Sequence, residues 1–406
     1  MSKNFKKENT HLEIDFLNEN FIRNPFPTYN KIRKKDPIFR FLMPTGQYAW
    51  IITKHKDATE ILSDSRFITN FEQSHADKQP IPPHKEIISR NLLNVNPSDH
   101  RRLRRLVQKA FTPRMVENLR GRIDEISNEL LDKVQNKGEM KLIEDFAFPL
   151  PIIVICEMLG VPIKDQDKFH KWSSILMEGV NNPDFSKKSD KVLIEFVDYL
   201  KELIAQKRNN LQKDLISDLI SVEDEGDVLT QHELYALIFV LIIAGHETTV
   251  NLIGNGILAL LEYPEQKEKL QHQPELIHSA IEEILRYDGP VEVSNVRWAT
   301  EDIEFKGKHI EKGEMILISF SSANRDSQQF PNPDQLDITR EANNHIAFGK
   351  GVHYCVGAPL ARLEGEIAIG TLMRRMPNLR LNTDFNSLEW RSGMIIRGLK
   401  EIPLLF

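Results

Sequence analysis

The stretch FGKGVHYCVGAPLAR, Phe348 to Arg362, holds one of only two cysteines in the 406-residue chain. The glycines on both sides of Cys355 allow positive φ angles and a close approach of the backbone to a partner. Pro359 suits the first turn of a helix, so Cys355 lies just before a helix N-terminus. There the helix dipole and the free N–H groups favour thiolate over thiol. The stretch therefore predicts a thiolate that a glycine-rich loop presents to a partner.

The same residues also fit other kinds of site. An isolated cysteine in a glycine turn is most often a buried structural residue, and Cys355 with His353 could form the nucleophile pair of a cysteine enzyme. A phosphate loop is disfavoured because Tyr354 stands where GxGxxG needs its third glycine. A zinc site is disfavoured because Cys355, His353 and His345 have no fourth ligand at a usual spacing.

The composition is that of an ordinary soluble globular protein, and the net charge of −6 argues against nucleic-acid binding. Two cysteines cannot form a disulfide framework, which favours a reducing cytosol. The first ten residues, MSKNFKKENT, lack the apolar core of a signal peptide. The most continuous apolar run, Leu234 to Gly245, has 12 residues, whereas a membrane span needs about 20. We therefore expect a cytoplasmic protein with no membrane or nucleic-acid partner.

The spacing of apolar residues predicts a mainly α fold with small β-sheets, of the α+β class, in a single domain at 1–406. A hairpin is expected from Ile38–Leu42 and Ala49–Thr53, which flank PTGQ. The helix that contains HRRLR is expected to have Ser98 or Asp99 as its N-cap. The predicted regions are a helix-rich core at about 97–286 and 357–375, with minor β regions at about 36–53, 291–320 and 379–406.

The longest predicted helix follows Thr230 as its N-cap and is apolar on all sides, which predicts a central, buried position. Two more helices are expected at 165–181 and 187–207, around a loop that contains Pro183. The loop 73–98 is rich in Pro, His, Asn and Ser. Because long loops in compact domains are often functional, we expect it to form a variable lid together with this helix pair.

The predicted central helix carries AGHETT at 244–249, which interrupts its apolar run. A buried carboxylate such as Glu247 must be paired, protonated or functional. Small residues followed by an acid and a hydroxyl suit a site that holds a small ligand and delivers protons to it. The alternative is a helix kink in which Thr248 bonds back to a carbonyl. His246 is interpreted as a packed side chain rather than a proton relay, and Cys156 as a core residue.

Two short charged motifs are weak signals by themselves. EEILR places Glu283 and Arg286 three residues apart on one helix face, a spacing that Glu117 and Arg120 share. An exposed pair of this kind contributes little, so the motif gains meaning only if a third partner buries it.

Basic residues gather in HRRLR, at 100–104, and Arg297 is a lone cation in a β-like run. His100 and Arg104 share a helix face and, like Arg297, could bind a carboxylate or phosphate, although such cations are more often solvated. Although the net charge of the chain is negative, this segment presents a basic face formed by Arg101, Arg102 and Arg105.

Taken in order, these motifs resemble the cytochrome P450 family of haem-thiolate monooxygenases. FGKGVHYCVGAPLAR fits the family's haem-binding pattern F-G-x-G-x-H-x-C-x-G-x-x-L-A-R at every fixed position. AGHETT looks like its oxygen-activating helix motif, EEILR like its E-x-x-R, and ANRD with FPNPDQLDITR like the segment before the haem loop. The resemblance covers nearly the whole chain. It implies the cytochrome P450 fold, in which a long central helix lies over a buried haem.

The resemblance assigns Cys355 as the axial thiolate on the iron of haem b, where its electron donation favours O–O cleavage. Phe348 would pack beside the sulfur, and the matching cations would hold the haem propionates. The other cofactor-binding positions implied by the resemblance are His100, Arg104, Ala244, Gly245, Arg297, Phe348, Gly349, His353 and Gly357.

The resemblance also assigns the proton chemistry and the structural brace. Glu247 and Thr248 match the acid–alcohol pair that directs protons to dioxygen, for which Ala244 and Gly245 would make room. The brace of the haem loop would consist of Glu283, Arg286 and Arg340.

The implied reaction is RH + O2 + two electrons + two protons giving ROH and water, by hydroxylation or epoxidation. Electrons should come from a ferredoxin or flavodoxin with its NAD(P)H reductase, and the enzyme should be a monomer. Arg101, Arg102, Arg105 and Lys350 are expected to receive the acidic redox partner.

The substrate is expected to be a hydrophobic small molecule, since the family-matched pocket positions are chiefly apolar. The sequence as a whole resembles soluble bacterial members of the family that modify polyketides or macrolides. Fatty acids are the other common class of substrate. Two alternatives are a haem-binding protein without oxygenase turnover and a peroxide-driven enzyme, neither of which needs the Glu247–Thr248 pair. The expected pocket residues are Val240, Ile243, Ala244, Val293, Asn295, Ile395 and Ile396.

Overall fold

The computed structural model describes residues 15–16, 18–43, 46–70, 91–181, 186–224, 226–341 and 343–406. Most of the predicted lid, at 73–90, and the turn at 182–185 between the helices of the predicted pair lie outside the described residues.

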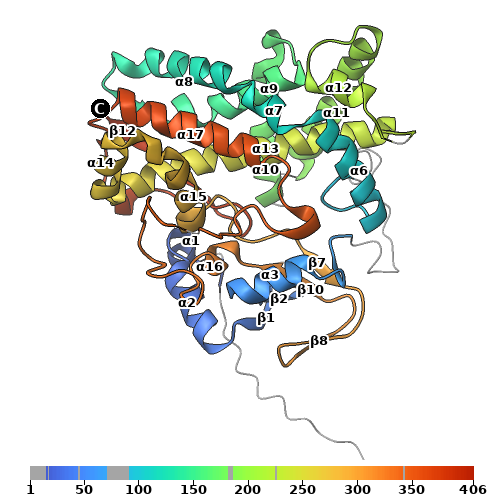
Figure 1. The fold of residues 1–406 in the computed structure, drawn as a ribbon, viewed down its shortest axis with the longest axis vertical. Helices are drawn as coiled ribbons and strands as arrows, with labels where there is room; N and C mark the ends of the chain where they lie inside the picture. The colour runs from blue at the N-terminus through green and yellow to red at the C-terminus, as the bar shows by residue number, and fades with distance from the viewer. Residues whose placement is uncertain are drawn as a thin grey trace, which may run out of the picture.

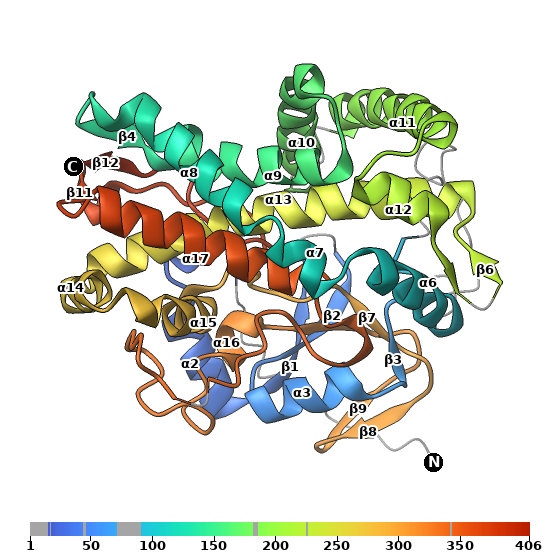
Figure 2. The same cartoon turned by 45° about the horizontal axis from the view of Figure 1, so that its top comes forward.

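A bundle of helices forms one part of the molecule and a smaller part built around strands forms the other (Figure 1). Helix α13 (Gln231–Glu262) packs against α9 (Pro149–Leu159), α15 (Ile277–Asp288) and α17 (Ala358–Arg375). Figure 2 shows α17 running beside α13, with the chain that enters α17 passing between the two parts. The mainly α prediction with small sheets is confirmed.

Helix α13 is the longest helix among the described residues and lies at the centre of the bundle. Thr230 is its N-cap, as predicted, and forms a capping box with Glu233, whose side chain accepts from the Thr230 N–H at 2.8 Å. The helix is long and apolar enough to cross a membrane by length and composition, but 61% of its most apolar window is buried inside the protein. Its all-round hydrophobicity therefore matches the position of a core helix.

The main sheet has five strands in the order β1-β2-β10-β7-β3. The predicted hairpin is present as an antiparallel pair in which Ile38 faces Ile52. Strand β10 joins β2 in parallel, which brings the chain around Met315 beside residues from the N-terminal region. The strands are β1 (Ile38–Leu42), β2 (Tyr48–Ile52), β3 (Phe67–Ile68), β7 (Arg297–Ala299) and β10 (Met315–Ile318).

The smaller sheets lie elsewhere on the molecule. One has three strands in the order β11-β12-β4, and the other two are antiparallel pairs, β5 with β6 and β8 with β9. Their bounds are β4 (Glu139–Lys141), β5 (Glu223–Asp224), β6 (Asp227–Val228), β8 (Ile303–Phe305), β9 (Lys308–Ile310), β11 (Arg380–Leu381) and β12 (Pro403–Leu405).

One helix start differs from the prediction. Helix α6 (Pro97–Ala110) is capped by Asn96, whose side chain accepts from the Asp99 N–H at 2.9 Å, and not by Ser98 or Asp99. Pro97 explains the shift, because its fixed φ suits the first helical position, which makes the preceding residue, Asn96, the cap. The other α-helices are α1 (Glu19–Arg23), α2 (Phe26–Lys35), α3 (His55–Ser63), α7 (Pro113–Glu117), α8 (Arg120–Gln135), α10 (Gln166–Asn181), α11 (Ser186–Asn209), α12 (Leu215–Ser221), α14 (Pro264–His272) and α16 (Phe320–Ala323).

Candidate functional site

The loop that presents Cys355 is closed by its own backbone. The Cys355 N–H donates to the Phe348 carbonyl at 2.9 Å, and the Gly349 N–H donates to the Ile346 carbonyl at 2.9 Å. Cys355 lies three residues before the start of α17 at Ala358. The sequence expectation of a cysteine just before a helix N-terminus is therefore met in the geometry.

Two glycines are required by the path of this loop. Gly349 and Gly351 have φ angles of +72° and +74°, in the left-handed region that favours glycine. A Cβ on Gly351 would also lie 2.8 Å from the carbonyl oxygen of Leu62, at the end of α3. The loop is thus pressed against the smaller part of the molecule as well as joined to the helix bundle.

The Cys355 sulfur lies in a mixed electrostatic environment. Its side chain is accessible to water, yet the surrounding protein raises the pKa of the thiol by desolvation. Backbone N–H groups of Gly357 and Ala358 bond the sulfur and, with Arg104, act against that rise in pKa. Such donors at a helix N-terminus are the means by which a protein stabilises a thiolate once it has a cationic partner.

Four basic side chains gather beside this loop. The rings of His100 and His353 lie 4.2 Å apart between centroids. Arg104 donates to the Tyr354 carbonyl at 2.7 Å, and Arg297, in β7, donates to the Phe67 carbonyl at 3.0 Å. The structure therefore brings together the four basic residues that the sequence singled out. They come from α6, β7 and the cysteine loop.

Burial disfavours the charged form of each of these side chains, and neighbouring charges add to this effect at the two histidines. Burial, then the charges of His100 and the neighbouring arginines, lowers the pKa of His353 to about 3. Burial and Arg104 lower the pKa of His100 to about 4, and burial lowers that of Arg297 to about 10. Among the described residues, no carboxylate is paired with Arg104 or Arg297. A buried cluster of this kind suits a ligand that carries negative charge.

At the AGHETT segment, one face of the otherwise buried helix α13 is exposed. Ala244 is exposed, although it stands in the middle of a buried helix. The Thr248 hydroxyl donates to the Ala244 carbonyl at 2.7 Å, and that of Thr249 donates to the Gly245 carbonyl at 3.0 Å. The back-bonding that the sequence offered as an alternative is thus present at both threonines.

Glu247 is buried and paired, but its partner was missed from the sequence. The Arg391 Nη1 lies 2.7 Å from its Oε1, and the Asn251 side chain donates to the Glu247 carbonyl at 2.9 Å. One turn further along α13, Asn251 packs so tightly on Gly398 that a Cβ there would collide with its side chain. The rule that a buried carboxylate needs a partner predicted a cation here, but nothing local pointed to Arg391.

His246 faces away from this exposed turn. Its side chain is fully buried, and its ring meets that of Phe148 edge-on with centroids 4.2 Å apart. Its Nε2 lies 3.2 Å from the Phe148 carbonyl oxygen. These contacts fit the interpretation of a packed side chain. Cys156, also predicted to be a core residue, is fully buried.

Glu364 is a second buried acid that the sequence analysis did not single out. It lies on α17 and is 2% exposed. Burial raises its pKa to about 8, and a hydrogen bond with the Thr249 side chain acts in the opposite direction. Its position in LARLEGE, nearly two turns beyond the helix start, gave no signal of contact with α13.

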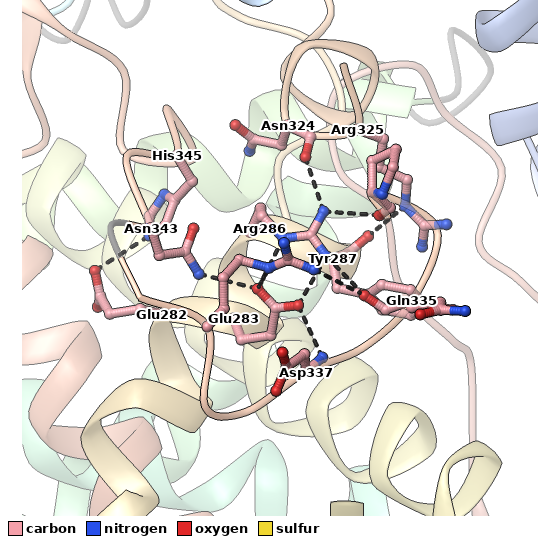
Figure 3. Close-up of polar contacts among 12 residues, drawn as sticks. Glu282, Glu283, Arg286, Tyr287, Asn324, Arg325, Gln335, Asp337, Asn343 and His345 are labelled. Atoms are coloured by element: carbon pink, nitrogen blue, oxygen red, sulfur yellow. Dashed lines mark hydrogen bonds and ion pairs between the residues drawn. The ribbon is translucent and has the colours of Figure 1, made fainter. Parts of the chain in front are cut away.

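The Glu283–Arg286 pair forms the centre of a buried network (Figure 3). Two hydrogen bonds of 2.7 and 2.8 Å join the side chains, which are both 0% exposed. The Arg340 Nε donates to Glu283 at 2.9 Å, as does the Asn343 side chain at 3.0 Å. Arg286 also donates to the carbonyls of Asn324, Pro333 and Gln335.

The same spacing elsewhere produces a different result. Glu117 and Arg120 also pair, at 2.5 Å, but their side chains are 61% and 49% exposed. Arg340 joins the buried pair as a third partner at 2.9 Å, whereas Glu366, 3.9 Å from Arg120, leaves the other pair exposed to solvent.

The expected pocket positions differ in how far they are exposed to solvent. Val240 and Ile243 are half-buried on α13, and Asn295 is exposed, as is Ile395 at 39%. Val293, in contrast, is 1% exposed and belongs to a core cluster of the smaller part of the molecule. Ile396 lines a small pocket next to Phe21, Glu292 and Arg391.

The predicted basic face is only partly available. Arg101, Arg105 and Lys350 are exposed. Arg102 is half-buried and pairs with Asp227 at 3.2 Å and with Glu233 of the α13 capping box. Its charge is therefore neutralised within the chain.

Comparison with known proteins agrees with the geometry over nearly the whole chain. A family model described as Cytochrome P450 matches residues 16–379. A Bacillus subtilis (strain 168) protein named Cytochrome P450 is 43% identical over 410 residues, covering 100% of both chains.

Two solved structures extend this likeness to three dimensions. Cytochrome P450 PksS of the Bacillus subtilis 168 bacillaene polyketide synthase gives a TM-score of 0.91 at 40% identity, covering 97% of this chain and 99% of that one. P450BioI, in complex with an acyl carrier protein ligated with hexadec-9Z-enoic acid, gives 0.89 at 38% identity, covering 95% and 99%.

Proposed function

This chain belongs to the cytochrome P450 family, and on that premise we propose that it oxidises a polyketide or a related secondary metabolite. It is a monooxygenase that binds haem b and inserts one oxygen atom of O2 into a hydrophobic small molecule. The observation that carries the proposed substrate class is the likeness to PksS, which is named for polyketide biosynthesis. The hydrophobic character of the substrate is supported by Ala244, an exposed apolar residue on a buried helix, with half-buried Val240 and Ile243 on the same helix. An apolar lining of this kind favours a hydrophobic ligand.

The residues around Cys355 fit haem. Cys355 supplies a single thiolate with N–H donors, which is the ligand set of a haem-thiolate centre. The arginines that lack carboxylate partners among the described residues, Arg104 and Arg297, would hold the two propionates together with His100 and His353. Phe348, Gly349 and Gly357 would shape the loop beside the sulfur. Bound haem supplies the iron at which O2 is activated.

The chain's own contribution to the reaction is proposed to be proton delivery. Glu247 and Thr248 are the groups proposed to pass protons to dioxygen. The Thr248 hydroxyl already donates to the Ala244 carbonyl, so it is free to accept a hydrogen bond on the exposed side of the helix. Gly245 permits close packing of α13 there, because a Cβ would lie 3.2 Å from the Ile155 side chain.

The remaining assignments are proposals that membership of the family supports. The electron donor is proposed to be a ferredoxin or flavodoxin with an NAD(P)H reductase, which docks through Arg101, Arg105 and Lys350. We place the protein in the cytoplasm as a monomer. The network of Glu283, Arg286 and Arg340 is proposed to brace the segment that leads into the cysteine loop.

Substrate class is tested by optical titration of the ferric enzyme. Displacement of the water on iron shifts the Soret band to the blue, so a polyketide or macrolide panel is compared with fatty acids, both free and carrier-bound. Saturable shifts with the polyketide panel support the proposal. Shifts confined to fatty acids would replace it with fatty-acid hydroxylation, for which the likeness to P450BioI is the reason. Absence of a strong red shift with CO after reduction would refute thiolate ligation by Cys355.

A further inference from the structure

A second charged cluster lies beside the cysteine loop and is not part of the Glu283 network. Arg362, on α17, forms two hydrogen bonds with Glu282 of α15, from Nε at 2.6 Å and from Nη2 at 2.9 Å. This bidentate pair fixes the plane of the guanidinium as well as its position. The side chains are 24% and 19% exposed, so solvent screens the pair only in part.

Arg362 is directed at the cysteine loop by two further contacts. Its guanidinium carbon lies 4.5 Å from the centroid of the Phe348 ring. Its Nη1 donates to the Tyr354 hydroxyl at 3.1 Å. Both residues are also bonded through their backbone carbonyls. The Phe348 carbonyl accepts from the Cys355 N–H, and the Tyr354 carbonyl accepts from Arg104.

Glu282 is held in turn by His345, which is visible beside it in Figure 3. The Ala347 N–H donates to His345 Nδ1 at 3.1 Å, so the ring proton lies on Nε2 and points at Glu282, 3.2 Å away. The hydrogen bonds from His345 and Arg362 outweigh the desolvation of this carboxyl and lower its pKa to about 2. Glu282 is therefore a fixed anion that anchors the arginine.

A fixed positive charge in this position acts on the sulfur. The contacts with Phe348 and Tyr354 hold the Arg362 guanidinium against the loop that carries this sulfur. Glu282 cancels part of this charge, but the Arg362 end of the pair is the one that contacts Phe348 and Tyr354. The positive end of the pair therefore faces the cysteine loop and favours added negative charge on the iron–thiolate unit.

We propose that Arg362, anchored by Glu282 and His345, is a positioning residue that raises the reduction potential of the haem and so eases its first reduction. The inference rests on Cys355 being the iron ligand. The reaction concerned is the one-electron reduction of ferric to ferrous iron, with the electron supplied by the redox partner in the cell and by an electrode in the test. Arg362 does not touch the reacting atoms and acts only through its charge and its fixed place.

The test is a spectroelectrochemical titration of the substrate-free holoenzyme, which needs no turnover. Arg362→Gln removes the charge and is expected to lower the equilibrium constant for reduction about tenfold, a shift of ~59 mV toward negative potential. Arg362→Lys restores the charge without the bidentate pair and is expected to recover part of this shift. The matched control is Arg374→Gln, which removes an exposed charge from the same helix, where Arg374 lies 3.8 Å from Asp124.

Each outcome has a defined meaning. A potential for Arg362→Gln equal to that of the wild type would overturn the proposal, and so would an equal shift in Arg374→Gln. If Arg362→Gln fails to hold haem with a thiolate ligand, Tyr354→Phe removes only the hydroxyl that positions Arg362. This variant must then give a smaller shift in the same direction, and an unchanged potential refutes the idea. The CO-bound Soret band of the wild type separately reports thiolate ligation, so failure of the proposed function is recognised independently.

Discussion

Arg391 Nη1 lies 2.7 Å from Glu247 Oε1, although 144 positions separate the two residues in the chain. The side chain of Glu247 is 3% exposed, whereas that of Arg391 is 32% exposed. Arg391 also lines a pocket that contains Glu292, Ile396 and Arg397. The pair therefore joins the acid of the central helix to a more accessible side of the protein, and it fixes where the carboxylate rests.

Loss of Arg391 should impair both folding and proton delivery. Arg391→Gln leaves a buried carboxylate without its cation, a change that typically lowers the free energy of unfolding by about 1–3 kcal/mol. We also expect less product per NAD(P)H consumed, because Glu247 loses its fixed orientation. Urea unfolding and the ratio of product to NAD(P)H measure the two effects. Lys400→Gln, which breaks a nearby pair whose side chains are 60% and 72% exposed, should change neither.

Removal of the Thr248 hydroxyl should separate electron use from product formation. Thr248→Ala loses a group that bonds only within its own helix, so stability should change by less than about 0.5 kcal/mol. NAD(P)H consumption should continue while peroxide rises and product falls. A peroxide assay beside product analysis tests this, and coupling equal to that of the wild type would exclude a proton-delivery role. Thr248→Ser, which keeps the hydroxyl, is the control for a general helix effect.

Breaking the two glutamate–arginine pairs, which have identical spacing, should affect the stability of the protein very differently. Glu283→Gln leaves Arg286 and Arg340 as buried cations without an anion, and breaking such a pair commonly lowers the free energy of unfolding by about 3–5 kcal/mol. Much less haem-loaded protein is expected. Glu117→Gln breaks an exposed pair and should leave the thermal midpoint unchanged. Equal midpoints for the two variants would contradict the proposed bracing role.

The buried carboxyl of Glu364 should make stability fall as pH rises. Burial raises its pKa to about 8 from an ordinary value of 4.5. Between these values the folded protein keeps a proton that the unfolded chain has released, so the free energy of unfolding decreases with pH, by at most about 1.4 kcal/mol per unit. Glu364→Gln should remove this part of the slope.

Urea unfolding between about pH 5 and pH 8 measures the effect. Glu292, whose pKa burial raises to about 7, contributes in the same direction, so some slope should remain in the variant. Glu275→Gln, at an exposed position on the surface, is the control and should keep the full slope. A variant at position 364 with the same slope as the wild type would show that Glu364 is ionised in the folded protein.

The redox-partner face should depend on its exposed cations but not on Arg102. Lys350→Glu and Arg101→Glu should raise the apparent KM for the ferredoxin or flavodoxin, with a larger rise at low salt because such charges are screened. Arg102 is already neutralised by Asp227 and Glu233, so Arg102→Gln should affect stability more than KM. Unchanged KM values in both charge-reversal variants would place the docking site elsewhere.

The parts of the site that could be predicted from the sequence are those whose pattern lies within one short segment. The cysteine loop, the AGHETT turn and the Thr230 cap each depend on neighbours within a few residues, so their patterns are visible in the sequence. Arg340 could be added to the Glu283–Arg286 pair because the order of motifs along the chain resembled a known family.

The contacts that were missed join distant segments through side chains of ordinary type. Arg391 reaches Glu247 from a C-terminal loop, and Glu364 reaches Thr249 from a different helix. Arg362 stands inside the quoted haem-loop pattern, yet its partner Glu282 precedes it by 80 residues. Charged residues are common, so their pairing becomes visible only once packing has placed them. Asn96 was missed as a cap for a local reason, the preference of Pro97 for the first helical position.

The two contacts of the C-terminal loop with α13 have a consequence for how this enzyme can change its substrate. Arg391 is fixed at Glu247, and Gly398 is fixed one helical turn away at Asn251. The residues between these two attachment points include Ile395 and Ile396, both expected to line the substrate pocket. Substitutions there can alter which molecule is accepted while the attachments keep the proton-delivering acid in place. Specificity can therefore diverge among descendants of this chain without rebuilding the catalytic apparatus.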